Sequence, residues 1–168
     1  TLYAQWNSTI TYDGNGQTSA SSTVPAPTIA KGTAGNTTLA NAGTMVKTGY
    51  TFGGWNTARD GSGTTYTSGA SGYTSLGSTT LYAQWNANTN NAITYNNQSA
   101  TTAQSGGSTT YTTGQAISTI PTTAPLKTGY TFAGWFTASS GGTQVTNGSY
   151  TPASPYGSVT LYAQWNAN

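Results

Sequence analysis

The heptapeptide TLYAQWN occurs three times in this chain, at residues 1–7, 80–86 and 160–166. A second motif keeps the same phase, because KTGYTFGGW at 47–55 and KTGYTFAGW at 127–135 each begin 33 positions before the next heptapeptide. Motifs that recur intact at a fixed spacing are typical of repeat proteins. The sequence therefore predicts a repeat of about 80 residues.

This period predicts how the chain is divided into modules. We expect residues 1–7 to be the closing strand of a preceding repeat and residues 8–86 to form the first module. A short linker at 87–91 would then lead into the second module at 92–168. On this interpretation the chain is a piece of a longer array, with its modules joined like beads on a string.

The heptapeptide has the side-chain pattern of a strand. Leu81, Ala83 and Trp85 stand at alternate positions, with Tyr82 and Gln84 between them. Successive side chains of a strand point to opposite faces, so this alternation predicts a half-buried strand that closes each module.

The KTGY motif leads into a second predicted strand. Tyr50 and Phe52 stand at alternate positions there, and the Gly53-Gly54 pair indicates a β-bulge or the close approach of another backbone. Short β-prone segments rich in Thr, Ile and Tyr open the two modules. The expected strands are 9–12, 50–56, 80–86, 92–95, 130–137 and 160–166.

Two dipeptides that tolerate positive φ predict hairpin turns. Asp60-Gly61 is expected to join the strand at 50–56, which we interpret as a central strand, to a strand at 64–67. Asn147-Gly148 is expected to join strands at 143–146 and 149–151. The prolines that precede each KTGY motif favour loops or edge strands, and they are Pro25, Pro27, Pro121 and Pro125.

Helical signal is nearly absent from the sequence. No window sustains a 3.6-residue apolar period, and the abundant Thr, Ser and Gly are poor residues for a helix interior. At most one short helical turn is expected in each module, at 32–42 or 115–120. The predicted fold class is therefore mainly β, with a small α+β character at most.

Composition excludes several classes of function. The chain has no His, Cys or Glu, and its acidic side chains are Asp13 and Asp60, both in Gly-rich turn sequences. Catalytic triads, thiol chemistry and paired-carboxylate hydrolysis lack their functional groups, so we expect no enzyme, no metal site and no cofactor. Charged residues make up 4% of the chain, which is too few for a nucleic-acid footprint. The apolar stretches are also too short to insert into a membrane.

Lys47 and Lys127 occupy equivalent places in the two KTGY motifs. A covalent Lys–Asn cross-link needs a nearby acid, and residues 87–168 contain no acidic side chain. We therefore expect a structural role, with the lysine stem lying across an aromatic ring or its charge protecting a strand edge.

The aromatic residues allow two interpretations. The first is a core, because these small modules have few other large apolar side chains and each buried ring stabilises the fold by roughly 2–3 kcal/mol. The second is a surface that stacks on sugar rings, with Phe136, Tyr82 and Tyr162 as the expected ligand contacts. The expected core residues are Leu81, Trp85, Leu161, Trp165, Tyr50, Phe52, Trp55, Tyr130, Phe132 and Trp135.

The combination of KTGYTFxGW with TLYAQW resembles the Listeria-Bacteroides repeat, the family that includes the B-repeats of internalin-type surface proteins. The resemblance covers both modules almost end to end. It implies small β-grasp-like (ubiquitin-like) units in tandem on extracellular proteins of the bacterial cell surface. It also implies no catalytic residues, and in a β-grasp unit the first and last strands would lie side by side and parallel.

We therefore expect a structural stalk or spacer whose partners are the neighbouring repeats of the same chain. Residues 1–7 carry a complete closing-strand sequence, so they are also expected to allow assembly with another copy by strand addition. The alternative is a carbohydrate- or protein-binding module that uses exposed aromatics and variable loops to bind a host or glycan ligand.

Overall fold

The computed structural model describes residues 7–18, 23–31, 37–71, 73 and 77–168. The chain divides into two compact units, Thr1–Asn86 and Ala87–Asn168, which we call module one and module two. The closing strand expected at 1–7 lies outside the described residues except for Asn7, which begins the first strand of module one.

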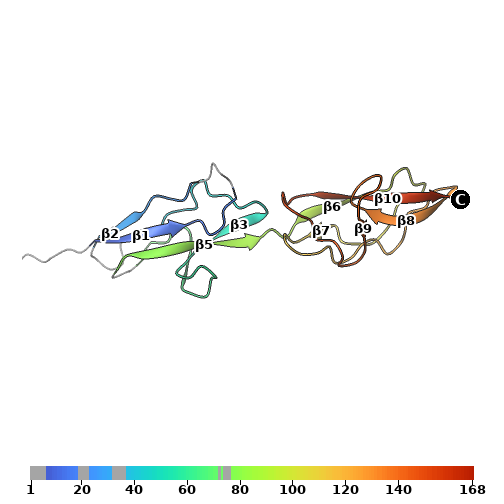
Figure 1. The fold of residues 1–168 in the computed structure, drawn as a ribbon. Coiled ribbons are helices and arrows are strands. Elements are labelled where there is room, and N and C mark those ends of the chain that lie inside the picture. The colour runs from blue at the N-terminus through green and yellow to red at the C-terminus, as the bar shows by residue number, and fades with distance from the viewer. Residues whose placement is uncertain (1–6, 19–22, 32–36, 72, 74–76) are drawn as a thin grey trace, which may run out of the picture. The chain divides into compact units, whose positions relative to one another are not determined.

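Module one contains one mixed sheet. Its strands are β1 (Asn7–Asp13), β2 (Thr28–Lys31), β3 (Tyr50–Asn56), β4 (Thr65–Tyr66) and β5 (Thr79–Ala87). Their order across the sheet is β2-β1-β5-β3-β4, so the first and last strands are neighbours (Figure 1). These two strands run parallel, with Ile10 opposite Thr79 and Tyr12 opposite Leu81. The Pro-flanked segment supplies β2, which lies at the sheet edge where a missing N–H is tolerated.

Module two repeats this topology. Its strands are β6 (Asn91–Asn96), β7 (Thr110–Tyr111), β8 (Tyr130–Phe136), β9 (Gln144–Val145) and β10 (Val159–Ala167), in the order β7-β6-β10-β8-β9. Strands β6 and β10 are parallel neighbours, with Ile93 opposite Val159. The described residues form no helix, and 115–120 and 38–42 are irregular loops. Residues 32–36, where the expected turn at 32–42 would begin, lie outside the described residues. The mainly β fold class is confirmed in this form.

The linker predicted at 87–91 is too long at both ends. Strand β5 continues through Ala87, and β6 already begins at Asn91. The heptapeptide and the opening strand therefore extend beyond the residues that their sequence patterns mark. Three residues, 88–90, remain between the strands.

In module two, a bulge in β8, the strand that follows the KTGY motif, aims two aromatic rings at the same core. In module two the register passes from Gly134 opposite Gln164 to Phe132 opposite Trp165, which leaves Ala133 as the extra residue. Phe132 and Trp135 consequently pack edge to face with ring centroids 5.6 Å apart. The Gly53-Gly54 pair occupies the equivalent place in module one, where Gly54 has φ +122°. A Cβ on Gly54 would lie 2.6 Å from the backbone oxygen of Tyr66, so the close approach of another backbone, one of the two alternatives predicted from these glycines, is confirmed in module one.

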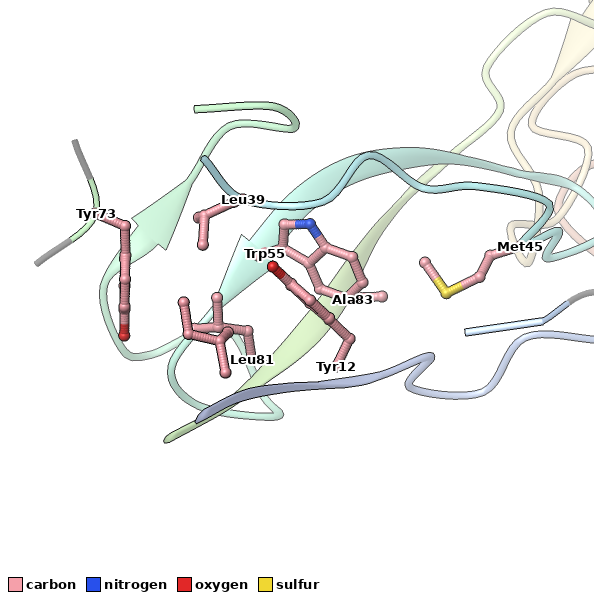
Figure 2. Close-up of a cluster of buried hydrophobic side chains, with 8 residues drawn as sticks. Tyr12, Leu39, Met45, Trp55, Tyr73, Leu81 and Ala83 are labelled. Carbon is pink, nitrogen blue, oxygen red and sulfur yellow. The ribbon is translucent and has the colours of Figure 1, made fainter. Parts of the chain in front are cut away.

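Each module packs its own core on one face of its sheet. In module one, Trp55 lies among side chains from β1, β5 and the loop that precedes β3 (Figure 2). The buried members are Ile10, Tyr12, Leu39, Met45, Trp55, Tyr73, Leu81 and Ala83. The corresponding members in module two are Ile93, Tyr111, Ile117, Trp135, Val145, Leu161 and Ala163.

The two predicted hairpins have different outcomes. Asp60-Gly61 does lie between paired strands, since Asn56 of β3 is opposite Thr65 of β4. The hairpin predicted at Asn147-Gly148 is wrong, because β9 pairs with β8 through the turn at 139–142 and no strand follows at 149–151.

The Asn147-Gly148 dipeptide still forms a turn, but its hydrogen bonds go elsewhere. Asn147 accepts from the Ile120 N–H at 2.8 Å, and Gly148 N–H donates to the Ile117 carbonyl at 2.9 Å. The backbone of this turn is thus paired with the 117–120 loop, a long-range contact that leaves no local sequence signal.

Candidate functional site

The closing strands place their apolar residues in two layers. Leu81 and Leu161 are fully buried in the centre of their modules. Trp85 and Trp165 are half-buried at the margin of the core. Trp85 packs against Phe52 of β3, with ring centroids 5.6 Å apart. Trp165 packs in the same way against Phe132 of β8, with ring centroids 5.5 Å apart.

The three residues expected to contact a ligand are all half-buried. Phe136 lies directly opposite Tyr162 in the β8–β10 pairing, so module two does bring two of them together. In module one, the Arg59 guanidinium stacks on Tyr82 at 5.0 Å from the ring centroid. Asn56 replaces Phe136 there and is fully buried.

Tyr130 is not a core residue, contrary to the sequence prediction. Tyr130 is 42% exposed, and the equivalent Tyr50, also predicted to be core, is half-buried and is not among the side chains that form or pack against the core of module one. Both tyrosines begin a central strand, and Tyr130 pairs with Ala167 near the end of β10. At this end of the sheet the Tyr130 ring contacts the Lys127 ammonium, 4.5 Å from its centroid, and is open to solvent.

The KTGY motif builds this lysine–tyrosine contact as a turn. Tyr50 N–H donates to the Lys47 carbonyl at 2.9 Å, and Tyr130 N–H donates to that of Lys127 at 3.1 Å. The glycine at the third position has φ +82° in one copy and +79° in the other, as a type II turn requires. A turn of this kind brings its first and fourth residues together.

The lysine ammonium consequently lies over the tyrosine ring in both modules. The distance from Nζ to the ring centroid is 4.8 Å for Lys47 and 4.5 Å for Lys127. Such cation–π pairs are favourable by about 0.5–1 kcal/mol at exposed positions. The lysines were expected to lay their stems across an aromatic ring, whereas the structure places the ammonium group itself over the ring.

In module two, this turn separates two adjoining surface hollows. One has a volume of about 460 Å³ and a mainly apolar wall that includes Pro125, Leu126 and Phe132. The other has about 420 Å³ and a mainly polar wall that includes Gln98, Ser140 and Gln164. Their shared boundary consists of Lys127, Tyr130 and Trp165.

Sequence reasoning missed the walls of these hollows. Leu126 is 62% exposed, and the equivalent Val46 is 50% exposed. An apolar residue directly before both KTGY motifs was the available signal. Gln98 carried no such signal, because it reaches the site through a turn whose partners are distant in sequence.

The described residues contain no group of three or more His, Cys, Asp or Glu side chains that would hold a metal ion. In module one, Asp13 forms an ion pair with Arg59 at 2.6 Å. Asp60 accepts hydrogen bonds from the Ser62 hydroxyl and N–H, which hold the pKa of this exposed carboxyl below its usual value. Both carboxylates thus serve turn and surface contacts. No helix among the described residues is long and apolar enough to cross a membrane.

Comparison with known families gives a match over both modules. The model of the Listeria-Bacteroides repeat domain matches residues 9–84 and again residues 92–164. These two segments contain the KTGY motifs, the parallel strand pairs and most of both closing strands.

Three relatives show the same similarity. A putative Gly-rich membrane protein of Evansella cellulosilytica is 34% identical over 138 residues, which is 77% of this chain and 15% of the relative. A putative membrane protein of the same organism is 42% identical over 52% of this chain and 13% of its own length. Internalin H of Listeria monocytogenes is 38% identical over 73% of this chain and 20% of its own length. The chain thus matches a small part of each relative, and no solved structure matches it.

Proposed function

Because the chain belongs to the Listeria-Bacteroides repeat family, we propose that it is a spacer or stalk segment of a longer protein of the bacterial cell envelope. The names of its relatives, internalin H and two putative membrane proteins, support the envelope location. The segment would lie on the extracellular side. A spacer also fits a chain that has no His, Cys or Glu side chain for catalysis.

The parallel pairing of first and last strands is the observation that carries this proposal. In module one β1 pairs with β5, and in module two β6 pairs with β10. Tension applied to the two ends of a module would therefore load all hydrogen bonds of that pair at once, in shear. The same pairing, in a mixed five-stranded sheet, supports the proposal of a β-grasp-like unit that lacks its helix among the described residues.

Single-molecule pulling on the full chain tests the mechanical role. We expect a sawtooth with one force peak for each module. Each peak should release on the order of 80 residues, or about 250 Å of chain. A featureless extension would refute the spacer proposal.

A disulfide across the loaded pair gives a matched control. Thr11 and Thr80 are partners in the β1–β5 register, and their neighbours Tyr12 and Leu81 fill the core, so both threonines lie on the outer face. The Thr11→Cys, Thr80→Cys variant should lose the module-one extension when oxidised and regain it when reduced. An unchanged extension after oxidation would mean that this strand pair does not carry the load.

Assembly with another copy is a second proposal, and it rests on the sequence of residues 1–7. The same heptapeptide at 80–86 lies in β5, between β1 and β3. A heptapeptide with this sequence has the side-chain pattern to join an open sheet edge of another molecule. Deletion of residues 1–6 should lower the oligomeric state measured by light scattering, and an unchanged mass would refute this assembly.

A further inference from the structure

The ammonium group of Lys127 is an uncompensated charge on a shaped surface. It is the single charged side chain in the fully described module two. One of its N–H groups donates to the Gln98 carbonyl at 3.3 Å, and the ammonium lies 4.5 Å from the Tyr130 ring and 5.8 Å from that of Trp165. An ammonium has three donors, and the Gln98 carbonyl takes one of them.

The polar hollow beside Lys127 presents fixed hydrogen-bond acceptors. Gln164 donates through its amide nitrogen to the carbonyls of Ala138 at 3.0 Å and Gly141 at 2.6 Å. Gln98 is held in the same way, by a 3.0 Å bond to the Ser139 carbonyl. Because each amide is anchored through its nitrogen, its oxygen is left to accept a hydrogen bond from a ligand hydroxyl.

The apolar hollow on the other side supplies a packing surface. Tyr130 and Leu126 are exposed here, beside the half-buried Trp165. Exposed aromatic and aliphatic surface suits the C–H face of a sugar ring. Both hollows have volumes of several hundred Å³, within the usual range for small-ligand sites.

We propose that the surface around Lys127, Tyr130 and Gln164 binds an acidic polysaccharide through one of its uronic acid residues. The carboxylate pairs with the Lys127 ammonium, the sugar ring packs on Tyr130 and Leu126, and the ring hydroxyls donate to the glutamine oxygens. An acidic peptide would satisfy the charge, but it offers few hydroxyls for the polar hollow. This site is independent of the spacer role.

Module one carries the same KTGY turn but has a charge that opposes an anionic ligand. Asp60 is equivalent to Ser140, because the two residues follow the tryptophan of their KTGY motifs at the same spacing. Ser140 lines the polar hollow of module two. The Asp60 carboxylate is exposed and bonded to Ser62. The proposed site is therefore specific to module two, and module one supplies the design of a test.

The test uses the full chain and three probes: trigalacturonate, neutral galactotriose and triglutamate. Binding is followed by NMR through the amide signals of Gln98, Lys127 and Tyr130. We expect trigalacturonate to shift these signals, with an affinity that falls as salt is added. Galactotriose and triglutamate should bind at least about tenfold more weakly, a difference of about 1.4 kcal/mol.

Substitutions with matched controls locate the site. Lys127→Met and Ser140→Asp should each weaken trigalacturonate binding at least about tenfold. Lys47→Met, which changes the equivalent lysine of module one, should leave it unchanged, and the melting temperature of every variant reports whether module two stays folded. Ser140→Asp adds the charge of module one at an exposed position, so it tests repulsion without disturbing the core.

Several results would overturn the proposal. No shift with trigalacturonate, or equal binding of galactotriose, would mean that no uronate is recognised. Tighter binding of triglutamate would reassign the surface to acidic peptides. Equal losses of trigalacturonate affinity in folded Lys47→Met and Lys127→Met variants would show that the ligand responds to the net charge of the chain and not to a site around Lys127.

Discussion

The turn after the first strand reads DGNG at 13–16 in module one and NNQS at 96–99 in module two. Its backbone is nearly the same, since Asn15 has φ 47° and Gln98 has φ 52°. Each of these side chains donates to a carbonyl in the loop after the central strand, at 2.9 and 3.0 Å. Different residues thus reach one geometry, so it is imposed by the strands on either side.

The tryptophans differ more than this turn does. In module one, the indole N–H groups of Trp55 and Trp85 donate to backbone carbonyls at 2.7 and 2.9 Å. The equivalent groups of Trp135 and Trp165 are buried and have no hydrogen-bond partner in the fully described module two. Both modules still fold to one strand order. The comparison teaches that the placement of rings sets this topology, while hydrogen bonding at their edges is free to vary.

The largest expected effect is loss of a core ring. Trp55→Ala should lower the free energy of unfolding of module one by about 3–5 kcal/mol, because it leaves a large cavity. Trp135→Ala should do the same in module two. Denaturant titration, followed through the amide signals of each module, measures both. Near-wild-type stability of either variant would contradict the core role of its ring.

The next largest effect is a difference in stability between Ala substitutions at Gly54 and at Gly134. A Cβ at Gly54 would lie 2.6 Å from the backbone oxygen of Tyr66, whereas at Gly134 it would lie 2.5 Å from the movable Gln144 amide. Both positions have positive φ, so Gly134→Ala should cost about 1–2 kcal/mol and Gly54→Ala about 1 kcal/mol more. Thermal melting compares the two, and equal losses would show that the backbone contact yields easily.

Trp→Phe substitutions isolate the indole hydrogen bonds. Trp55→Phe leaves the Ala40 carbonyl without its donor, whereas Trp135→Phe removes an N–H that had no partner. The loss in unfolding free energy should therefore be about 1 kcal/mol larger for Trp55→Phe. Equal losses in denaturant titrations would mean that the bond contributes no net stability.

The stability of module two should also depend on Ser99, in the turn after its first strand. Ser99 has φ 61°, a conformation that glycine adopts without a Cβ penalty, and module one has Gly16 at that position. Ser99→Gly should stabilise module two by up to about 1 kcal/mol, with Gly16→Ser destabilising module one by a similar amount. Paired melting curves test this exchange. A destabilised Ser99→Gly variant would mean that glycine's chain entropy dominates.

The smallest effect is a difference in pH response. The pKa of Asp60 is lowered in the folded state, so its contribution is present above the unfolded value of 3.8 and is lost as the pH falls through the folded pKa. Burial raises the pKa of Tyr95, so its contribution is present below 10.0 and is lost as the pH rises through the folded pKa. Acid should therefore act first on module one and alkali on module two. Melting temperatures across the pH range check this order, and an acid-sensitive module two would contradict it.

Local signals predicted the main frame of the fold. Alternation in the heptapeptide and the KTGY motif gives strands where β5, β3, β8 and β10 lie. A departure from regular strand geometry at Gly53-Gly54 was also predictable, because glycine is costly inside a regular strand. It matters here, since strict alternation would have placed Phe52 and Trp55 on opposite faces, whereas their rings are 5.1 Å apart.

Contacts distant in sequence were beyond this reasoning. The Asn147-Gly148 turn pairs with residues near Ile117, and Lys127 bonds to Gln98, 29 positions away. The candidate site depends on such contacts, so its glutamines were not predicted. The prediction that Tyr130 is a core residue was wrong for another reason. Alternation tells which face of the sheet a side chain lies on, but not how close the residue lies to the end of the sheet.

In module one, the side chain of Asn56 holds the shape of the loop at 57–64, which follows it in the chain. Its amide nitrogen lies within hydrogen-bonding distance of the Gly61 and Gly63 carbonyls, at 3.1 and 3.2 Å, and of Thr65 Oγ1 at 2.9 Å. Its oxygen accepts from the Ala58 and Gly63 N–H groups. One planar side chain thus serves as a template for the whole 57–64 segment. The exposed residues of that segment other than its glycines are free to diversify under selection, or to be exchanged for a grafted epitope, while the amide keeps the path of the backbone.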